Sequence, residues 1–276
     1  MNTLPRILLG IALLTAAFTS ASRATVILFD DYSNAASGSL IGQTTSDGNA
    51  TYDATITSSN FQRTSVTWTE ADSEVADSLG SYMAQTFNNP SATTWMNLSS
   101  NLDPVSDYTF TIDYLNLTSG AGNGVFAISG RSNSNSLTSI FTLTLTSGNS
   151  SIGVNYIDAN GTTTSLGTVT GIVSTRAGGS YYLSDVEVRV VGNTQQLFLG
   201  GVAYGSPVAT QGTYDDGTTD LIRLYAKAGT GAFDVRFDNI SVVAVPEPGM
   251  AAMIGLGALG LWGFGRARRI HRKNRI

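Results

Sequence analysis

The chain has 276 residues, of which 42% are hydrophobic and 13% are charged, and it contains no cysteine. The lack of cysteine excludes disulfide bonds, thiol catalysis, cysteine-ligated zinc and iron–sulfur clusters. A chain of this length can bury a stabilising core without such cross-links. Its threonine, valine, tyrosine and phenylalanine residues favour β structure.

Charge is distributed unevenly along the chain. Eight of the 15 basic residues lie in the first 24 or the last 11 positions, whereas 19 of the 20 acidic residues and the other seven basic residues lie within residues 25–245. The middle of the chain therefore carries a net charge of −12. A surface of this sign repels phosphate backbones, so we expect no nucleic-acid partner.

Residues 1–24 have the three parts of a secretory signal peptide. Arg6 supplies a positive start, Ile7–Phe18 is an apolar run, and Ser22-Arg23-Ala24 offers small residues on either side of Arg23, as a cleavage site requires. The alternative is an uncleaved anchor, but twelve apolar residues are too few to span a bilayer core of about 30 Å. We therefore predict cleavage after Ala24, with a cut after Ala21 as the second choice.

Apolar and polar residues alternate with a period of two through residues 25–245. Strands of this pattern have one buried and one solvent-facing side, as in an antiparallel sandwich. Turn signals such as Asp47-Gly48, Asn160-Gly161 and Gly192-Asn193 separate them, and Ala71–Leu79 is the one weak helix candidate. We predict one all-β domain, an antiparallel β-sandwich of the jelly-roll type. The clearest alternations are Tyr108–Tyr114, Phe141–Leu145, Ile152–Tyr156, Val186–Val190 and Phe233–Asp238.

Three segments of this domain are similar to parts of a known sandwich family. The hairpin Asp185–Gly201, the opening Leu28–Tyr32 with Gly38–Gly42, and the closing Phe237–Val242 resemble corresponding segments of concanavalin A-like and laminin G-like domains. The resemblance implies two facing antiparallel sheets. It also makes glycan binding, including binding of an exopolysaccharide, an expected activity.

Glu70, Asp72 and Glu74 form the sequence Glu-Ala-Asp-Ser-Glu. On a strand, alternate residues share a face, so the three carboxylates would line one groove. The sequence resembles the Glu-x-Asp-x-Glu box of retaining glucanases of the same fold, which implies Glu70 as nucleophile and Glu74 as acid/base. That family places its box among bulky apolar residues on a central strand. Here the spacers are Ala71 and Ser73, so a solvated acidic loop is the interpretation we prefer.

A structural calcium ion is a further candidate. Asp30 and Asp31 end the first predicted strand, and Asp238 and Asn239 lie in the last. First and last strands often pair in sandwiches, which would gather oxygen ligands of the kind that calcium binds. The alternative is that these residues form turns and strand edges. A second acidic turn contains Asp215, Asp216 and Asp220.

Other cofactors and catalytic groups have no support in the domain. The single histidine, His271, lies in the basic tail, which excludes a Ser–His–Asp triad within residues 25–245. Gly120–Gly124 is not followed by the helix that a phosphate loop needs. Aromatic residues that would stack on sugars if exposed, or pack in the core otherwise, are Trp68, Trp95, Tyr181, Tyr182 and Tyr204.

Residues 246–276 again have three parts. Val245-Pro246-Glu247-Pro248 is held extended by its prolines, residues 249–265 carry no charge, and residues 266–276 contain six basic residues. This order resembles the PEP-CTERM sorting signal. The resemblance implies an exosortase as a partner, a membrane helix at 249–265, cleavage near the Pro246–Pro248 box, and a host that makes exopolysaccharide. The alternative is a plain C-terminal anchor that is never processed.

The sequence thus predicts an exported protein that crosses the inner membrane and is sorted to the cell envelope or extracellular matrix. We expect it to be non-enzymatic and to bind glycan. Two alternatives stay open: a glycoside hydrolase or lyase that uses Glu70, Asp72 and Glu74, and a calcium-dependent adhesin.

Overall fold

The computed structural model describes residues 24–32, 38–39, 44–53, 69–71, 82–87, 93–99, 102, 105–119, 123–133, 137–146, 151–170, 180–218, 220–229 and 233–245. Residues 1–23 and 246–276, which hold the predicted signal peptide and sorting signal, lie outside this part. A search of the described residues for a helix long and apolar enough to cross a membrane finds none.

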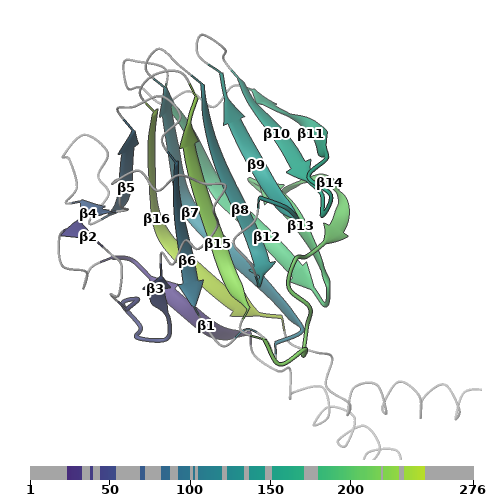
Figure 1. The fold of residues 1–276 in the computed structure, drawn as a ribbon. Coiled ribbons are helices and arrows are strands. Elements are labelled where there is room, and N and C mark those ends of the chain that lie inside the picture. Colours follow the sequence, from purple (N-terminus) through teal and green to yellow (C-terminus); the bar gives the residue numbers. More distant parts are fainter. Residues whose placement is uncertain are drawn as a thin grey trace, which may run out of the picture. The chain divides into compact units, whose positions relative to one another are not determined.

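Two antiparallel sheets face one another in the domain (Figure 1). Among the described residues, sheet A has nine strands in the order β14-β13-β12-β7-β16-β5-β4-β2, and β1 also pairs with β16. Its strands are β1 (Thr25–Asp30), β2 (Gly38–Ser39), β4 (Thr69–Ala71), β5 (Tyr82–Phe87), β7 (Asp107–Ser119), β12 (Ser180–Val191), β13 (Thr194–Leu199), β14 (Val202–Ala209) and β16 (Phe233–Ala244).

Sheet B has seven described strands in the order β11-β10-β9-β8-β15-β6-β3. They are β3 (Thr51–Asp53), β6 (Thr93–Ser99), β8 (Gly124–Ser132), β9 (Ile140–Leu145), β10 (Ser151–Ile157), β11 (Thr163–Thr170) and β15 (Leu221–Ala228). The prediction of an all-β antiparallel sandwich is confirmed for the described residues. Of the weak helix candidate, only Ala71 is described, and it ends the strand β4.

The core lies between the sheets, where the apolar residues of the alternating segments meet. Phe110 and Ile112 of β7 and Phe126 and Ile128 of β8 are fully buried in one cluster. The alternations predicted for Phe141–Leu145, Ile152–Tyr156, Val186–Val190 and Phe233–Phe237 also bury their apolar members there. Each fully buried large apolar side chain contributes roughly 1.5–3 kcal/mol.

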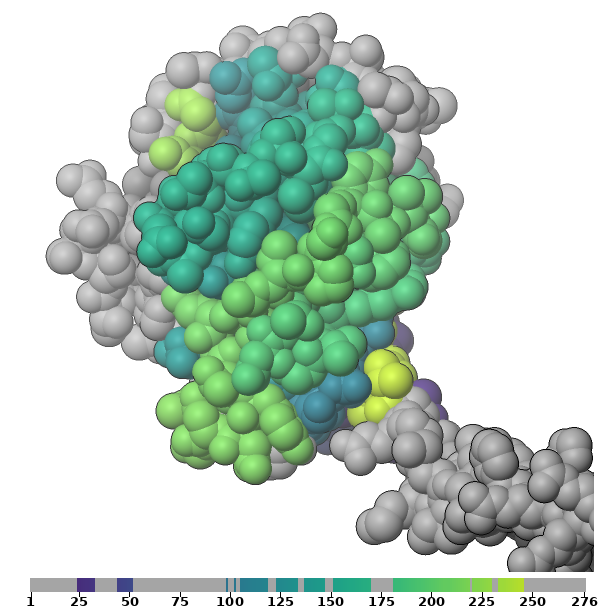
Figure 2. Space-filling view, turned by 90° about the vertical axis from the view of Figure 1, so that its right-hand side faces the viewer, coloured from purple at the N-terminus to yellow at the C-terminus, as the bar shows by residue number. Residues whose placement is uncertain are grey.

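The predicted hairpin is formed by β12 and β13, which pair from Val186↔Leu199 to Val191↔Thr194. Gly192 adopts φ +54° in the connecting turn, a conformation that glycine reaches without steric cost. Beyond it, β14 forms one edge of sheet A and touches β11, the edge of sheet B. Figure 2 shows these segments side by side on one face of the domain.

The alternation breaks at one level in three neighbouring strands of sheet A. Buried core residues are spaced three apart, rather than two, between Ile112 and Leu115 in β7. The same spacing separates Leu183 from Val186 in β12 and Phe237 from Ile240 in β16. Two successive side chains of each strand therefore lie off the core. The prediction that Tyr114 continues the buried face of β7 is wrong, because Leu115 takes that place.

Backbone conformation explains two of the three breaks. Asp185 has φ +50° and Asn239 has φ +51°, and a left-handed residue within a strand turns the next side chain to the other face. Asp and Asn adopt this conformation more readily than most residues. Register places Ser184 and Asp238 on either side of Tyr114, so Asp185, Asp113 and Asn239 form the adjacent row across the sheet.

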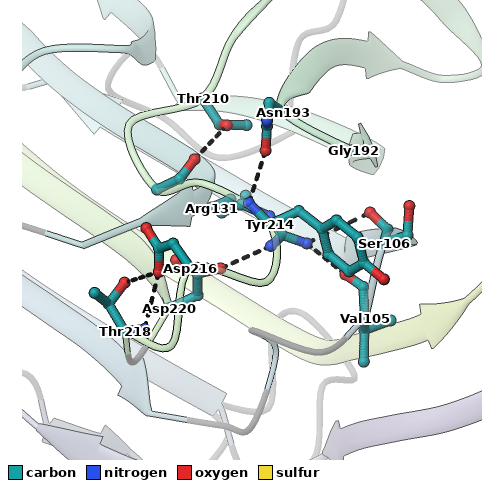
Figure 3. Close-up of polar contacts among 12 residues, drawn as sticks. Val105, Ser106, Arg131, Gly192, Asn193, Thr210, Tyr214, Asp216, Thr218 and Asp220 are labelled. Atoms are coloured by element: carbon teal, nitrogen blue, oxygen red, sulfur yellow. Dashed lines mark hydrogen bonds and ion pairs between the residues drawn. The ribbon is translucent and has the colours of Figure 1, made fainter.

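A buried ion pair closes one end of the sandwich (Figure 3). Arg131 Nη1 donates to Asp220 Oδ2 at 2.7 Å, and both side chains are fully buried. Arg131 Nη2 donates to the carbonyls of Val105 and Ser106, which precede β7. The guanidinium also lies 5.3 Å from the ring centre of Tyr108 and 5.7 Å from that of Tyr214. Arg131 thus joins the segment between β14 and β15 to both sheets.

Candidate functional site

Glu70, the one described member of the carboxylate box, lies near one edge of sheet A. Glu70 is the middle residue of the three-residue strand β4, between β2 and β5 at the end of the sheet. Glucanase boxes of this kind lie on a central strand, so the position of Glu70 departs from the resemblance. Asp72 and Glu74 lie outside the described residues, and the catalytic hypothesis stays untested.

The residues predicted to bind calcium are partly brought together. β1 pairs with β16, as predicted. Asp30 is buried, and its Oδ1 accepts the backbone N–H groups of Tyr32 at 2.9 Å and Ser46 at 3.1 Å, so it organises the turn after β1. Asp238 Oδ1 accepts the N–H of Asn239 at 2.8 Å.

Carboxylates nevertheless gather around Asp238. Burial raises the pKa of Asp238 to about 6, with the charges of Asp31, Asp113 and Asp30 acting in the same direction. Among the described residues, no group of three or more His, Cys, Asp or Glu side chains is placed to hold a metal ion. The calcium site at Asp30, Asp31, Asp238 and Asn239 stays a prediction.

The second acidic turn has a structural role. Asp220 is the partner of Arg131, so its charge is already compensated. Asp216 Oδ1 accepts the backbone N–H of Thr218 at 2.8 Å and closes a local turn (Figure 3). The three carboxylates of Asp215, Asp216 and Asp220 therefore do not form one ligand set.

The aromatic candidates separate clearly. Tyr181 is 9% exposed and belongs to the core, so core packing, the second of the two possibilities, applies to it. Tyr204 packs against the edge of the core from β14. The side chains of Trp68 and Trp95 lie outside the described residues. Tyr182 remains, half-buried on the outer face of sheet A.

Tyr182 is paired with a second tyrosine, Tyr114, which the alternation pattern places on the buried face of β7. The ring centres of Tyr114 and Tyr182 lie 4.6 Å apart with an interplanar angle of 42°. Both side chains are half-buried, and Tyr114 faces outward only because of the break after Ile112. The sequence carries a signal only in the neighbouring strands, where Leu183 and Val186 in β12, and Phe237 and Ile240 in β16, are spaced three apart. The pair forms an aromatic surface outside the core.

Polar side chains surround the tyrosine pair on the same face. Asn116 of β7 lies between its register partners Tyr182 in β12 and Arg236 in β16. Its side chain is 2% exposed, and its Oδ1 accepts a hydrogen bond from the Thr118 hydroxyl at 2.9 Å. Asp113 and Asp185 are exposed in the row beyond Tyr114. We call this surface the tyrosine platform; its residues are Asp113, Tyr114, Asn116, Tyr182, Asp185 and Asp238.

The pKa shifts of Asp113 and Tyr182 agree with the closeness of the platform residues to one another. Partial burial raises the pKa of Asp113, and the charge of Asp185 raises it further. Partial burial also raises the pKa of Tyr182, with the carboxylates of Asp185 and Asp113 contributing. The platform thus presents two phenol rings beside exposed carboxyl groups. Aromatic faces stack on apolar surfaces, and carboxylates accept hydrogen bonds from hydroxyl groups.

Comparison with known proteins gives similarity of structure alone. No family model matches the sequence, and no curated protein matches it. A carbohydrate esterase from the Shiga toxin-encoding bacteriophage phi24B has a TM-score of 0.49 and 13% identity, covering 81% of this chain and 100% of that chain. A cellulose-induced protein has a TM-score of 0.46 and 16% identity, with coverages of 78% and 96%.

A third solved structure, the alginate lyase A1-II′ of polysaccharide lyase family 7, has a TM-score of 0.39 and 13% identity. The matched region covers 67% of this chain and 86% of the lyase chain. At these identities and TM-scores, the similarity transfers no residue role and no ligand to this chain.

Proposed function

We propose that this chain is an exported, non-enzymatic protein of the cell envelope or extracellular matrix that binds glycan at the tyrosine platform. The observation that carries the proposal is the half-buried pair of Tyr114 and Tyr182 beside the exposed carboxylates of Asp113 and Asp185. A pyranose ring has an apolar face and a rim of hydroxyl groups. The platform offers a partner for each.

The location of the platform supports binding rather than structural packing. The core is already formed by residues on the other face of β7, β12 and β16. Placing two successive side chains per strand outside the core costs the sheet apolar contacts at that level. A ligand that covers both rings would recover buried apolar area at about 25 cal/mol per Å².

Export and sorting rest on the two ends of the sequence. The signal peptide at 1–24, the Pro246–Pro248 box, the uncharged run 249–265 and the basic tail support processing by an exosortase. The intact mass of the mature protein from each cell fraction tests this part. A mass that still includes Trp262 and the basic tail would favour a permanent anchor instead.

Affinity electrophoresis of the purified protein through gels containing single polysaccharides tests the binding part. Tyr182→Ala and Tyr114→Ala should each lower the affinity for the retarding polysaccharide about tenfold, since loss of one stacked ring removes roughly 1–1.5 kcal/mol of binding free energy. Tyr204→Ala is the matched control, because it removes a half-buried tyrosine from β14. Retardation that all three variants reduce equally would place binding elsewhere, and no retardation by any glycan would leave only a structural role.

A further inference from the structure

The tyrosine platform lies in an acidic region of sheet A. Outward-facing residues of β7, β12 and β16 include the acids Asp107, Asp113, Asp185, Glu187, Asp234 and Asp238, against Arg189 and Arg236. Arg189 is engaged by Glu187, with its Nε and Nη2 donating to Glu187 Oε2 at 2.8 and 2.6 Å. The face around the two rings is therefore negative.

Asp113 and Asp185 have the strongest influence on a ligand above the rings. Both are exposed, they occupy one row across β7 and β12, and Tyr114 and Ser184 fill the next row. From the rise per residue and the spacing between strands, a group that stacks on Tyr114 would lie roughly 6–8 Å from both carboxylates. In water, each would disfavour a bound anion about threefold, and the two together about tenfold at low salt.

A buried amide adds a donor for an uncharged partner. Asn116 is 98% covered, and its Oδ1 accepts the Thr118 hydroxyl, but no described residue accepts a hydrogen bond from its Nδ2. Leu115 and Leu117 on either side point into the core, so this amide lies on the platform side of β7. A sugar hydroxyl or ring oxygen can accept from Nδ2 without bringing a charge beside the carboxylates.

We propose that the tyrosine platform selects uncharged glycans and rejects polyanionic ones. This inference rests on the proposed function and names the class of glycan. The sugar stacks on Tyr114 and Tyr182, its hydroxyl groups donate to Asp113 and Asp185, and it accepts from Asn116. The two exposed carboxylates act as the specificity determinants, since a uronate or sulfate at the same place meets like charge.

Matched pairs of polymers with and without charge test the inference on the full-length protein. The probes are hydroxyethylcellulose against carboxymethylcellulose, and dextran against dextran sulfate, in affinity electrophoresis at low salt. The variant is Asp113→Asn with Asp185→Asn, two exposed positions. The control is Asp215→Asn with Asp216→Asn, which changes the net charge equally on the segment between β14 and β15.

We expect the wild type to bind the neutral member of at least one pair about tenfold more tightly than its anionic counterpart. The Asp113/Asp185 variant should lose this preference, and the control should keep it. Equal or tighter binding of the anionic polymers, or a preference that the Asp113/Asp185 variant retains, overturns the inference while glycan binding stands. Binding of no polymer in either pair overturns the inference together with glycan binding at the platform.

Discussion

The ion pair of Arg131 and Asp220 gives the sharpest stability prediction. Both side chains are fully buried and 2.7 Å apart, so Asp220→Asn leaves a buried guanidinium without its ion-pair partner. Removing one member of a buried pair costs about 3–5 kcal/mol, and the remaining contacts of Arg131 with the Val105 and Ser106 carbonyls favour the lower end. We expect a loss of about 3 kcal/mol in the free energy of unfolding, a large share of the 5–15 kcal/mol typical of a domain.

Urea denaturation followed by tryptophan fluorescence measures this loss. The double variant Arg131→Met with Asp220→Leu removes both charges, so it should be more stable than Asp220→Asn alone. Glu187→Gln is the control, since the Glu187–Arg189 pair is solvent-exposed and should contribute less than about 1 kcal/mol. The reasoning is refuted if Asp220→Asn lies within 1 kcal/mol of wild type, or if the double variant is the less stable of the two.

Three further results are expected. Gly124→Ala should destabilise the protein by about 1–3 kcal/mol in urea denaturation, because a β-carbon there collides with the Phe233 ring. Gly153→Ala on β10 should be near neutral, because a β-carbon there meets its nearest atoms at 3.8–3.9 Å, an ordinary van der Waals distance; equal effects of the two changes would contradict the packing. The raised pKa of Asp238, about 6, means that the folded state holds the proton more tightly than the unfolded state, so this group's contribution to stability falls as pH rises from about 4 to 6. Asp238→Asn should therefore be the more stable protein at pH 7 and lose that advantage at pH 4 in thermal melts, and a pH-independent difference would count against it. Glu247→Ala should leave a larger, inner-membrane form on immunoblots of cell fractions, and unchanged processing would argue against exosortase recognition.

Local pattern was enough to predict the sandwich but not the platform. Alternating segments such as Phe141–Leu145 gave both the strands and their buried faces, because a period of two fixes which side chains face the core. In β7 the same rule failed, since Tyr108–Tyr114 alternates without interruption in the sequence. The break follows from the left-handed residues in the two neighbouring strands, Asp185 and Asn239, and so from pairing across the sheet.

Local sequence pattern also does not predict contacts between residues that are far apart in the chain. Arg131 and Asp220 are 89 positions apart, and each belongs to a segment that reads locally as a polar turn or strand end. Nothing in the sequence near Asp220 distinguishes it from Asp216, which closes its own turn with Thr218. Pairing of the first and last strands could be expected from the general build of sandwiches, and it is present between β1 and β16.

The places of β15 and β16 bear on the order in which the protein can be assembled. β15 lies between β6 and β8 in sheet B, and β16 lies between β5 and β7 in sheet A. Among the described pairings, residues 221–244 are the bridge between β2–β6 and β7–β14 in both sheets. A ribosome synthesises this bridge after all the other described strands, so those strands emerge as two groups that are not yet paired with each other. After termination before residue 221, no described strand pairing would join the two groups, and non-local closure of this kind is slow.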